Sequence, residues 1–151
     1  MERDFLIAVA MGDLNKVKYY LNRGINPSID NNYAICEASK RGHIGIVKLL
    51  LIDKRVDPSV KNNYCIKCSS RNGHIEIVKL LLKDKRVDPS ADDNYSIWWA
   101  YLNDHNEVIK LLYKDSRVRD GIREKYMKSL ENSDKILSKK IEKIIAIKDL
   151  K

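Results

Sequence analysis

The sequence contains few of the residues that interrupt or cross-link a chain. Its 151 residues include three prolines, six glycines and three cysteines, and no stretch is rich in Pro or in Gly and Ser. A flexible linker is therefore not indicated, and we expect one domain that buries roughly two-thirds of its unfolded surface. Cys36, Cys65 and Cys68 are too few for a disulfide framework, which favours a reducing, intracellular setting.

Long hydrophobic runs are also missing. The longest apolar run, residues 5–11, is much shorter than the ~20 residues that cross a bilayer, so we expect no membrane insertion. The run does not suit a signal peptide either, because Glu2 and Asp4 place acidic groups where such peptides are basic.

The net charge of +8 is not spread evenly. Residues 121–151 carry nine Lys or Arg and five Asp or Glu, so the last fifth of the chain holds half of the excess. Such basicity suits an acidic partner surface or weak, nonspecific attraction to nucleic acid. Lys and Glu are interleaved throughout, however, and we therefore interpret most of these charges as solvated helix faces.

The main signal is a repeat of 31 residues. Ile-Val-Lys-Leu-Leu at 46–50 returns at 77–81 and, as Val-Ile-Lys-Leu-Leu, at 108–112. Two further features keep the same step, namely Tyr33, Tyr64 and Tyr95, and Pro27, Pro58 and Pro89. One period shared by several features predicts a solenoid, whose units stack because none can bury its apolar faces alone.

Each unit is predicted to contain two helices. A first helix runs from about Tyr33 to Arg41, with Asn31 or Asn32 as its N-cap. Gly42, like Gly73 in the next unit, should end that helix in a left-handed conformation. The second helix is apolar around most of its circumference, so neighbours must cover it on more than one side. Val-Asp-Pro-Ser at 56–59 then turns the chain.

Two segments connect these units to a known family. Gly-His-Ile-Gly-Ile-Val-Lys-Leu-Leu-Leu at 42–51 and its near copy at 73–82 closely resemble the second-helix motif of ankyrin repeats. The resemblance covers about residues 4–120. It implies an all-α fold, an ankyrin-repeat solenoid of helix–turn–helix units with β-turn fingers and a helical C-terminal cap. We expect a single domain over 1–151, with repeats at about 4–25, 33–53, 64–84 and 95–114 and a degenerate capping unit at about 118–151.

The units also depart from the family pattern. The Thr-Pro-Leu-His stretch that usually starts the first helix is replaced by Tyr-Ala-Ile-Cys at 33–36 and by similar segments in the next two units. Units of this kind with Arg-Val-Asp-Pro-Ser loops resemble ankyrin arrays encoded by giant DNA viruses of amoebae (mimivirus-like). A viral protein of this type would work in the host cell cytoplasm.

Residues 126–150 form an amphipathic pattern. Ile141, Ile144 and Ile145 fall at helical spacing with three lysines opposite them, and we predict a cap in which Leu137 and Ile141 dock on the fourth unit. A basic amphipathic helix of this kind also suits a membrane-surface or partner-binding element.

No residue set predicts catalysis or a bound metal. His43, His74 and His105 occupy equivalent places in successive units, about 8–10 Å apart, whereas zinc needs its nitrogens at about 2.0–2.1 Å. The resemblance implies instead that this His starts the second helix and hydrogen-bonds locally. Cys65-x-x-Cys68 lacks the strand–helix setting of a redox site, so we expect a packing role. Without a phosphate loop or a catalytic triad, we predict no enzyme activity and no cofactor.

Trp98 and Trp99 bring aromatic bulk only to the last full unit. In the aligned units these places hold Cys36-Glu37 and Lys67-Cys68. We expect one ring to seal the stack against the C-terminal helices. For the other ring, sealing the stack and serving as an exposed anchor for a partner stay as alternatives.

The resemblance implies a non-catalytic protein–protein interaction module and a monomer. Its concave face and finger tips, carried over by position, comprise Asp30, Asn32, Lys40, Arg41, Lys61, Asn63, Arg71, Asn72, Asp92, Asn94, Leu102 and Asn103. The four cations in the middle of this set predict an acidic partner segment. Binding of nucleic acid or an anionic surface through the basic face and C-terminal tail is the alternative, disfavoured because few aromatic residues interleave with the basic ones to stack bases.

Overall fold

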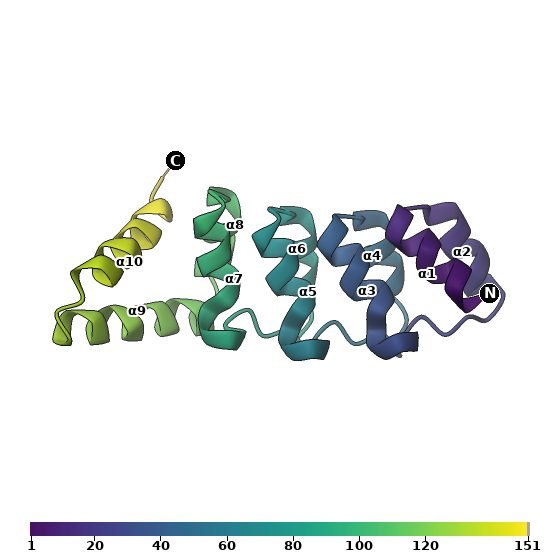
Figure 1. Cartoon of the computed structure of the whole chain (residues 1–151), viewed down its shortest axis with the longest axis horizontal. Coiled ribbons are helices and arrows are strands. Elements are labelled where there is room, and N and C mark those ends of the chain that lie inside the picture. Colours follow the sequence, from purple (N-terminus) through teal and green to yellow (C-terminus); the bar gives the residue numbers. More distant parts are fainter. Residues whose placement is uncertain (151) are drawn as a thin grey trace.

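The computed structural model describes residues 1–150, which form ten helices and no strand. Figure 1 shows the helices stacked in chain order along one axis. The all-α solenoid expected from the sequence is confirmed. The helices are α1 (Glu2–Met11), α2 (Leu14–Asn22), α3 (Ile29–Arg41), α4 (Ile44–Leu50), α5 (Val60–Arg71), α6 (Ile75–Leu81), α7 (Ala91–Leu102), α8 (Asn106–Tyr113), α9 (Ser116–Glu131) and α10 (Lys135–Ile147).

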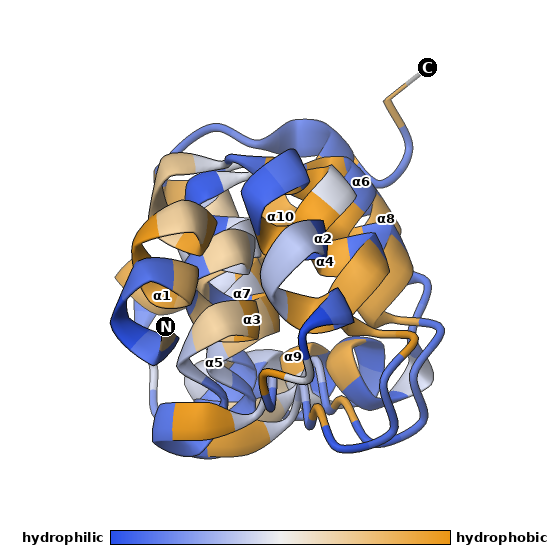
Figure 2. Cartoon of the chain, turned by 90° about the vertical axis from the view of Figure 1, so that its right-hand side faces the viewer, coloured by the Kyte–Doolittle hydropathy of each residue, from blue (hydrophilic) through white to orange (hydrophobic). Residues whose placement is uncertain are grey.

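The solenoid has two helical layers. The first helices of the units, α1, α3, α5 and α7, pack side by side, and α2, α4, α6 and α8 form the second layer. The view along the stack separates these layers and places the loops between units below them (Figure 2). The first-helix layer thus presents one continuous face, which we call the first-helix face.

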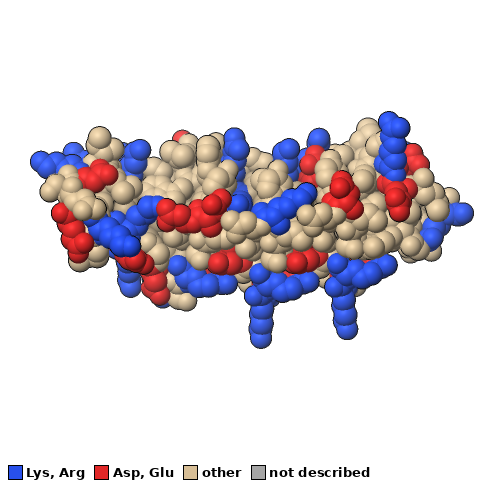
Figure 3. Space-filling model, turned by 60° about the horizontal axis from the view of Figure 1, so that its bottom comes forward, with Lys and Arg blue, Asp and Glu red and all other residues tan. Residues whose placement is uncertain are grey.

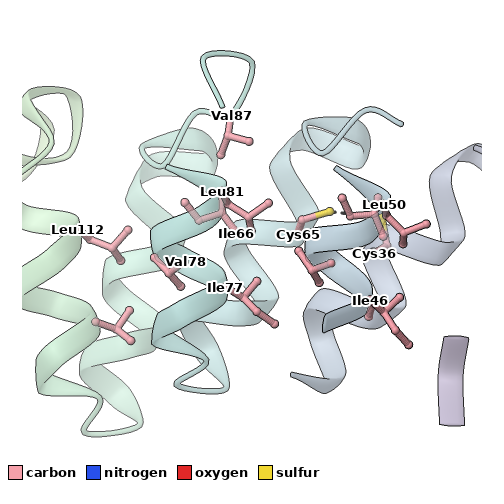
Figure 4. Close-up of a cluster of buried hydrophobic side chains, with 14 of the residues drawn as sticks. Cys36, Ile46, Leu50, Cys65, Ile66, Ile77, Val78, Leu81, Val87 and Leu112 are labelled. Carbon is pink, nitrogen blue, oxygen red and sulfur yellow. Dashed lines mark hydrogen bonds between the residues drawn. The ribbon is translucent and has the colours of Figure 1, made fainter. Parts of the chain in front are cut away.

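The core consists of columns of equivalent side chains. Ile66 of α5 and Ile77, Val78 and Leu81 of α6 are fully or almost fully buried, and Figure 4 shows the same column continuing toward Leu112. Full burial of one such aliphatic side chain is worth about 1.5–3 kcal/mol. Because every unit contributes the same positions, the core continues without a break from one unit to the next.

Gly42 and Gly73 end the first helices in the left-handed conformation, as predicted, with φ of 81° and 73°. A second reason for glycine lies in the next unit. A Cβ atom at Gly42 would lie 2.7 Å from the ring of His74, and one at Gly73 would lie 2.7 Å from the ring of His105. The glycines therefore permit both the turn and the close approach of the histidine.

The expectation that these histidines hydrogen-bond locally was wrong. The Nε2 atom of each ring lies 3.0–3.2 Å from a backbone carbonyl oxygen in the preceding unit: His43 faces Ala10, His74 faces Lys40 and His105 faces Arg71. A carbonyl only accepts, so the ring N–H donates. Since the first helix of the preceding unit ends within reach of the ring, the repeat-equivalent histidines connect the units.

The predicted Asn cap was also wrong. The right-handed part of α3 begins at Tyr33 as expected, but Asp30, Asn31 and Asn32 before it form a left-handed turn with φ of 51–58°. Asn tolerates this region because its short polar side chain can hydrogen-bond nearby. The Asn32 side chain bonds away from its own helix, and its Oδ1 accepts from the Asp57 N–H at 2.9 Å. In the next unit, Asn63 accepts from the Asp88 N–H at 2.7 Å.

The C-terminal helices differ from the central units. Two helices follow the fourth unit, and α9 already begins at Ser116, so that it covers the place equivalent to the loops at 51–59 and 82–90. The register explains the change, because Asp120 stands where the central loops have Pro58 and Pro89. Without a proline the helix continues, and the Asp115 carboxylate accepts from the Arg117 N–H at 3.0 Å at its start.

Helix α10 packs against both α8 and α9. Figure 1 shows it leaning back from the end of α9 toward α8. Ile141 and Ile144 are fully buried and Leu137 is half-buried, whereas Lys139, Lys140 and Lys143 are exposed. The apolar side of the helix thus covers the end of the core, and the lysines face away from it.

Candidate functional site

The first-helix face is bordered by three left-handed turns, at residues 30–32, 61–63 and 92–94. In each turn the first two side chains are exposed and the third, an Asn, is buried. Figure 3 shows the molecule from below, where acidic and basic side chains alternate along the stack. Most residues resist this backbone region at roughly 1–2 kcal/mol each, so the turns store strain that the surrounding structure must hold.

Several predicted contact residues also make hydrogen bonds or packing contacts within the protein. Asn32, Asn63 and Asn94 are buried; Asn32 and Asn63 bond to the loops that follow their helices, and Asn94 lies against α9. Asn72 donates its side-chain N–H to the Lys40 carbonyl at 2.7 Å, and Asn103 donates to the Trp99 carbonyl at 2.7 Å. These amides complete the backbone hydrogen bonding at helix ends and turns.

Two of the four cations predicted in the middle of this surface contact other side chains of the protein. Arg41 hydrogen-bonds to the Glu37 carboxylate one turn earlier, which raises the pKa of the Arg41 guanidinium. Arg71 lies over the Trp99 ring, 4.5 Å from the ring centroid. Lys40 and Lys61 are exposed, and within residues 1–150 their ammonium groups make no ion pair or hydrogen bond. Lys40, Lys61 and Arg71 are therefore the cations of this set that no carboxylate in the described residues pairs with, and of the three only Arg71 lies over an aromatic ring.

The fourth unit carries a different set of contacts. Asp92 pairs with Lys67 of the preceding unit at 3.1 Å, and the Lys67 ammonium lies 5.3 Å from the centroid of the Tyr95 ring. Leu102 at the end of α7 is 57% exposed. The sequence did not predict these contacts of Lys67, because nothing in the repeat distinguishes it from other lysines on helix surfaces.

The two tryptophans face different neighbours. Trp98 meets α9, where the Lys125 ammonium lies 5.7 Å from its ring centroid, and it forms an edge contact with Tyr101. Trp99 lies between Tyr95 at 5.6 Å and Arg71 of the preceding unit. Trp98 is thus the ring at the C-terminal junction, and Trp99 belongs to the first-helix face.

The loops at 51–59 and 82–90, here called the finger loops, are held by arginine clamps. Arg55 and Arg86 each bind the aspartate two residues earlier through two guanidinium nitrogens. The hydrogen bonds from Arg55 lower the pKa of the Asp53 carboxyl to about 2. Arg86 also donates to the Val56 carbonyl of the preceding loop at 3.0 Å. The repeated Asp-Lys-Arg-Val sequence contained this signal, although spacing alone did not reveal it.

The two cysteines that contact each other are not the two that lie closest in the sequence. The Cys65 thiol donates to Cys36 of the preceding unit with the sulfur atoms 3.8 Å apart (Figure 4), while Cys68 is half-buried. That hydrogen bond lowers the pKa of the Cys36 thiol and raises the pKa of the Cys65 thiol. Within residues 1–150, no three His, Cys, Asp or Glu side chains lie close enough to hold a metal ion.

Comparison with known proteins adds one positive finding. Residues 5–93 and 37–123 match a family model described as ankyrin repeats (3 copies). No curated protein matches the chain. In the part that the structure describes, no helix combines the length and apolar character that crossing a bilayer requires.

Proposed function

Since this chain belongs to the ankyrin-repeat family, we propose that it is a non-catalytic protein–protein interaction module that binds its partner through the first-helix face. Ankyrin repeats generally mediate protein–protein interaction, and the family is typically non-catalytic. The proposed contact residues are Asp30, Lys40, Lys61, Arg71, Asp92, Trp99 and Leu102.

The observation that carries this proposal is the set of left-handed turns beside the first helices. Backbone strain of this kind persists where the surrounding structure over-determines it, and it clusters at sites that hold ligands. Here the buried Asn of each central turn is bonded to the next finger loop, and the histidines fix the far ends of the first helices. Both borders of the face are therefore rigid, which reduces the entropy lost on binding.

The chemistry of the face favours an acidic partner segment with an apolar anchor. Lys40 and Lys61 offer charges that no intramolecular group neutralises, and an opposing carboxylate gains charge-assisted hydrogen bonds there. Trp99 and Leu102 lie farther along the same face, beside Arg71, and tryptophan and arginine are among the residues enriched at interface hot spots.

A peptide-display selection on the immobilised chain tests this proposal. Selected peptides should be rich in Asp and Glu and carry an apolar residue. Their affinity should fall at least about tenfold, or 1.4 kcal/mol, for a Lys40→Glu, Lys61→Glu double variant. A Lys54→Glu, Lys85→Glu variant makes the same charge change on the finger loops and should bind normally. Equal affinity for the wild type and the Lys40/Lys61 variant would place the interface elsewhere.

Nucleic acid or an anionic surface is the second candidate ligand. The observation in its favour is that Lys139, Lys140 and Lys143 on α10 are all exposed and make no ion pair with any residue in 1–150. Replacing the three lysines with Gln should then abolish oligonucleotide binding. That binding should also weaken steeply as salt is raised.

The finger-loop sequence suggests an origin in a giant DNA virus of amoebae. On that origin the partner would be a host protein of the cytoplasm. Purification of the tagged chain from infected amoebae, with the Lys40/Lys61 variant as control, tests both points together.

A further inference from the structure

A second, unassigned surface lies on the opposite layer of the stack. A half-open pocket of about 530 Å³ lies between α6, α8, the start of α9 and the end of α10. The second-helix layer and α10 lie together in Figure 2, away from the first-helix face. The pocket is lined by Ile75, Lys79, Glu107, Lys110, Leu111, Tyr113, Lys114, Arg119 and Lys148.

Cations outnumber carboxylates around this pocket. Five lining side chains are cationic and one is a carboxylate, and the cations come from α6, α8, α9 and the end of α10. Two more carboxylates, Glu76 and Asp120, pair with the lining cations Lys79 and Arg119 from outside the lining. Like charges gathered in one hollow repel one another and raise the local potential for anions. The unliganded protein therefore carries an electrostatic cost here that a bound anion would relieve.

The internal partners of these cations are few. Lys110 pairs with Glu107 at 2.7 Å and Lys79 with Glu76 at 2.6 Å, both as exposed pairs of the same helix. Such pairs contribute little and exchange readily with solvent. Lys114 has no ion pair within residues 1–150, and Lys148 has only the Tyr113 ring beneath its ammonium, 5.5 Å from the ring centroid. At least two cations are thus available to a ligand without breaking any ion pair.

We propose that this pocket binds a compact anion with several phosphoryl groups. Ammonium groups bind phosphate as point charges from any direction, and several converging lysines suit a ligand whose charges point outward from a small centre. Ile75, Leu111 and Tyr113 supply low-dielectric walls beside these charges, and such walls strengthen the attraction of a bound anion.

The neighbouring hollow shows why the C-terminal helices matter for this site. Between α4 and α6, Lys48, Lys79 and Lys83 surround Glu76, and no residue of α9 or α10 takes part. Arg119 and Lys148 of the C-terminal helices add their charges only to the pocket beside α8. Because these cations surround a single hollow, we expect a compact anion and not an extended polymer.

Calorimetric titration with inorganic tripolyphosphate at physiological salt tests the proposal. We expect saturable binding to one site. A Lys114→Glu, Lys148→Glu variant should bind at least about tenfold more weakly, because two attractive charges become repulsive. The Lys48→Glu, Lys83→Glu variant carries the same charge change on the same layer and should stay within about twofold of the wild type.

A second measurement uses the unmodified chain and does not depend on folding of the variants. Tripolyphosphate should protect Lys114 and Lys148 from acetylation, read by mass spectrometry, and leave Lys54 and Lys85 reactive. Failure of the wild type to bind at one site, or equal weakening by both variant pairs, would overturn the proposal. It would also be overturned if a single-stranded oligonucleotide bound more tightly than tripolyphosphate and both pairs weakened it.

Discussion

Between the central units the chain crosses in a finger loop, whereas after α8 it continues as a helix. In the central crossings, Asn32 and Asn63 accept from the backbone N–H groups of Asp57 and Asp88. At the C-terminal crossing, the equivalent N–H belongs to Arg119 and donates to the Asp115 carbonyl within α9 at 3.0 Å.

The same side chain therefore has different surroundings at the two kinds of crossing. The Asn94 Oδ1 atom is buried without a hydrogen-bond partner in the described residues, and α9 packs so closely that a Cβ atom at Gly121 would lie 2.4 Å from Asn94 Nδ2. An unpaired buried polar group costs about 1–3 kcal/mol. Asn94 therefore keeps the residue type and the left-handed backbone of Asn32 and Asn63, although it lacks the hydrogen bond that these two side chains make.

The largest expected effect concerns the proposed cap. Ile141→Ala removes a fully buried side chain from α10 and should destabilise the protein by about 2–4 kcal/mol. Ile136→Ala on the same helix is the control, because Ile136 is 73% exposed and should change stability little. Thermal unfolding followed by circular dichroism measures both. Equal melting temperatures for the two variants would mean that α10 does not share the cooperative core.

Gly121→Ala should come next in size. Alanine favours a helix interior over glycine, but the added methyl meets Asn94, and overpacking of this kind costs about 1–3 kcal/mol. Urea unfolding should therefore show destabilisation, and the second change Asn94→Gly should restore part of it by removing the opposing amide while keeping the left-handed backbone accessible. A stabilised single variant would show that α9 packs less closely on α7.

Replacing the turn asparagines separates the two kinds of crossing directly. Asn63→Gly keeps the left-handed backbone accessible but leaves the Asp88 N–H without its acceptor, which should cost about 1–2 kcal/mol more than Asn94→Gly. Chemical denaturation of the two variants measures the difference between their free energies of unfolding. If both cost the same, the Asn63 hydrogen bond contributes nothing to the central crossing.

The smallest expected effect is the pH dependence of the finger-loop clamp. The folded-state pKa of Asp53 is depressed to about 2 by Arg55, against about 3.9 when unfolded. The stabilisation is therefore complete above about pH 4 and is lost as the pH falls toward 2. Because the pair is largely solvated, the loss is small. Stability curves of Asp53→Asn and wild type should converge over this range, and parallel curves would contradict the clamp.

The fold followed from the sequence because the repeat period reports stacking directly. Ile46, Leu50 and their equivalents had to face neighbours, and Gly42 had to end its helix. The roles of Asn32 and His43 were misjudged for one shared reason. Their partners lie about 25 and 33 residues away along the chain, in the following finger loop and in the preceding unit, whereas a unit considered alone offers only local partners.

The candidate surface was harder to predict than the fold. Position in the repeat predicts which residues share the first-helix face, but whether a cation there is free of an ion pair depends on its side-chain partners. Arg41 and Arg71 are engaged by Glu37 and Trp99, while Lys40 and Lys61 are not. Such pairings lie outside the periodic pattern, because the residues that distinguish one unit from the next are the ones that the core does not constrain.

The most direct test of the proposed partner-binding face is an NMR titration of the labelled chain with a peptide selected by display. We predict shifts of the Trp99 indole N–H and of the backbone amides of Lys40 and Lys61, with the second-helix layer and α10 unchanged. Shifts confined to α10 or to the pocket around Lys114, with Trp99 and Lys61 unmoved, would contradict binding through the first-helix face.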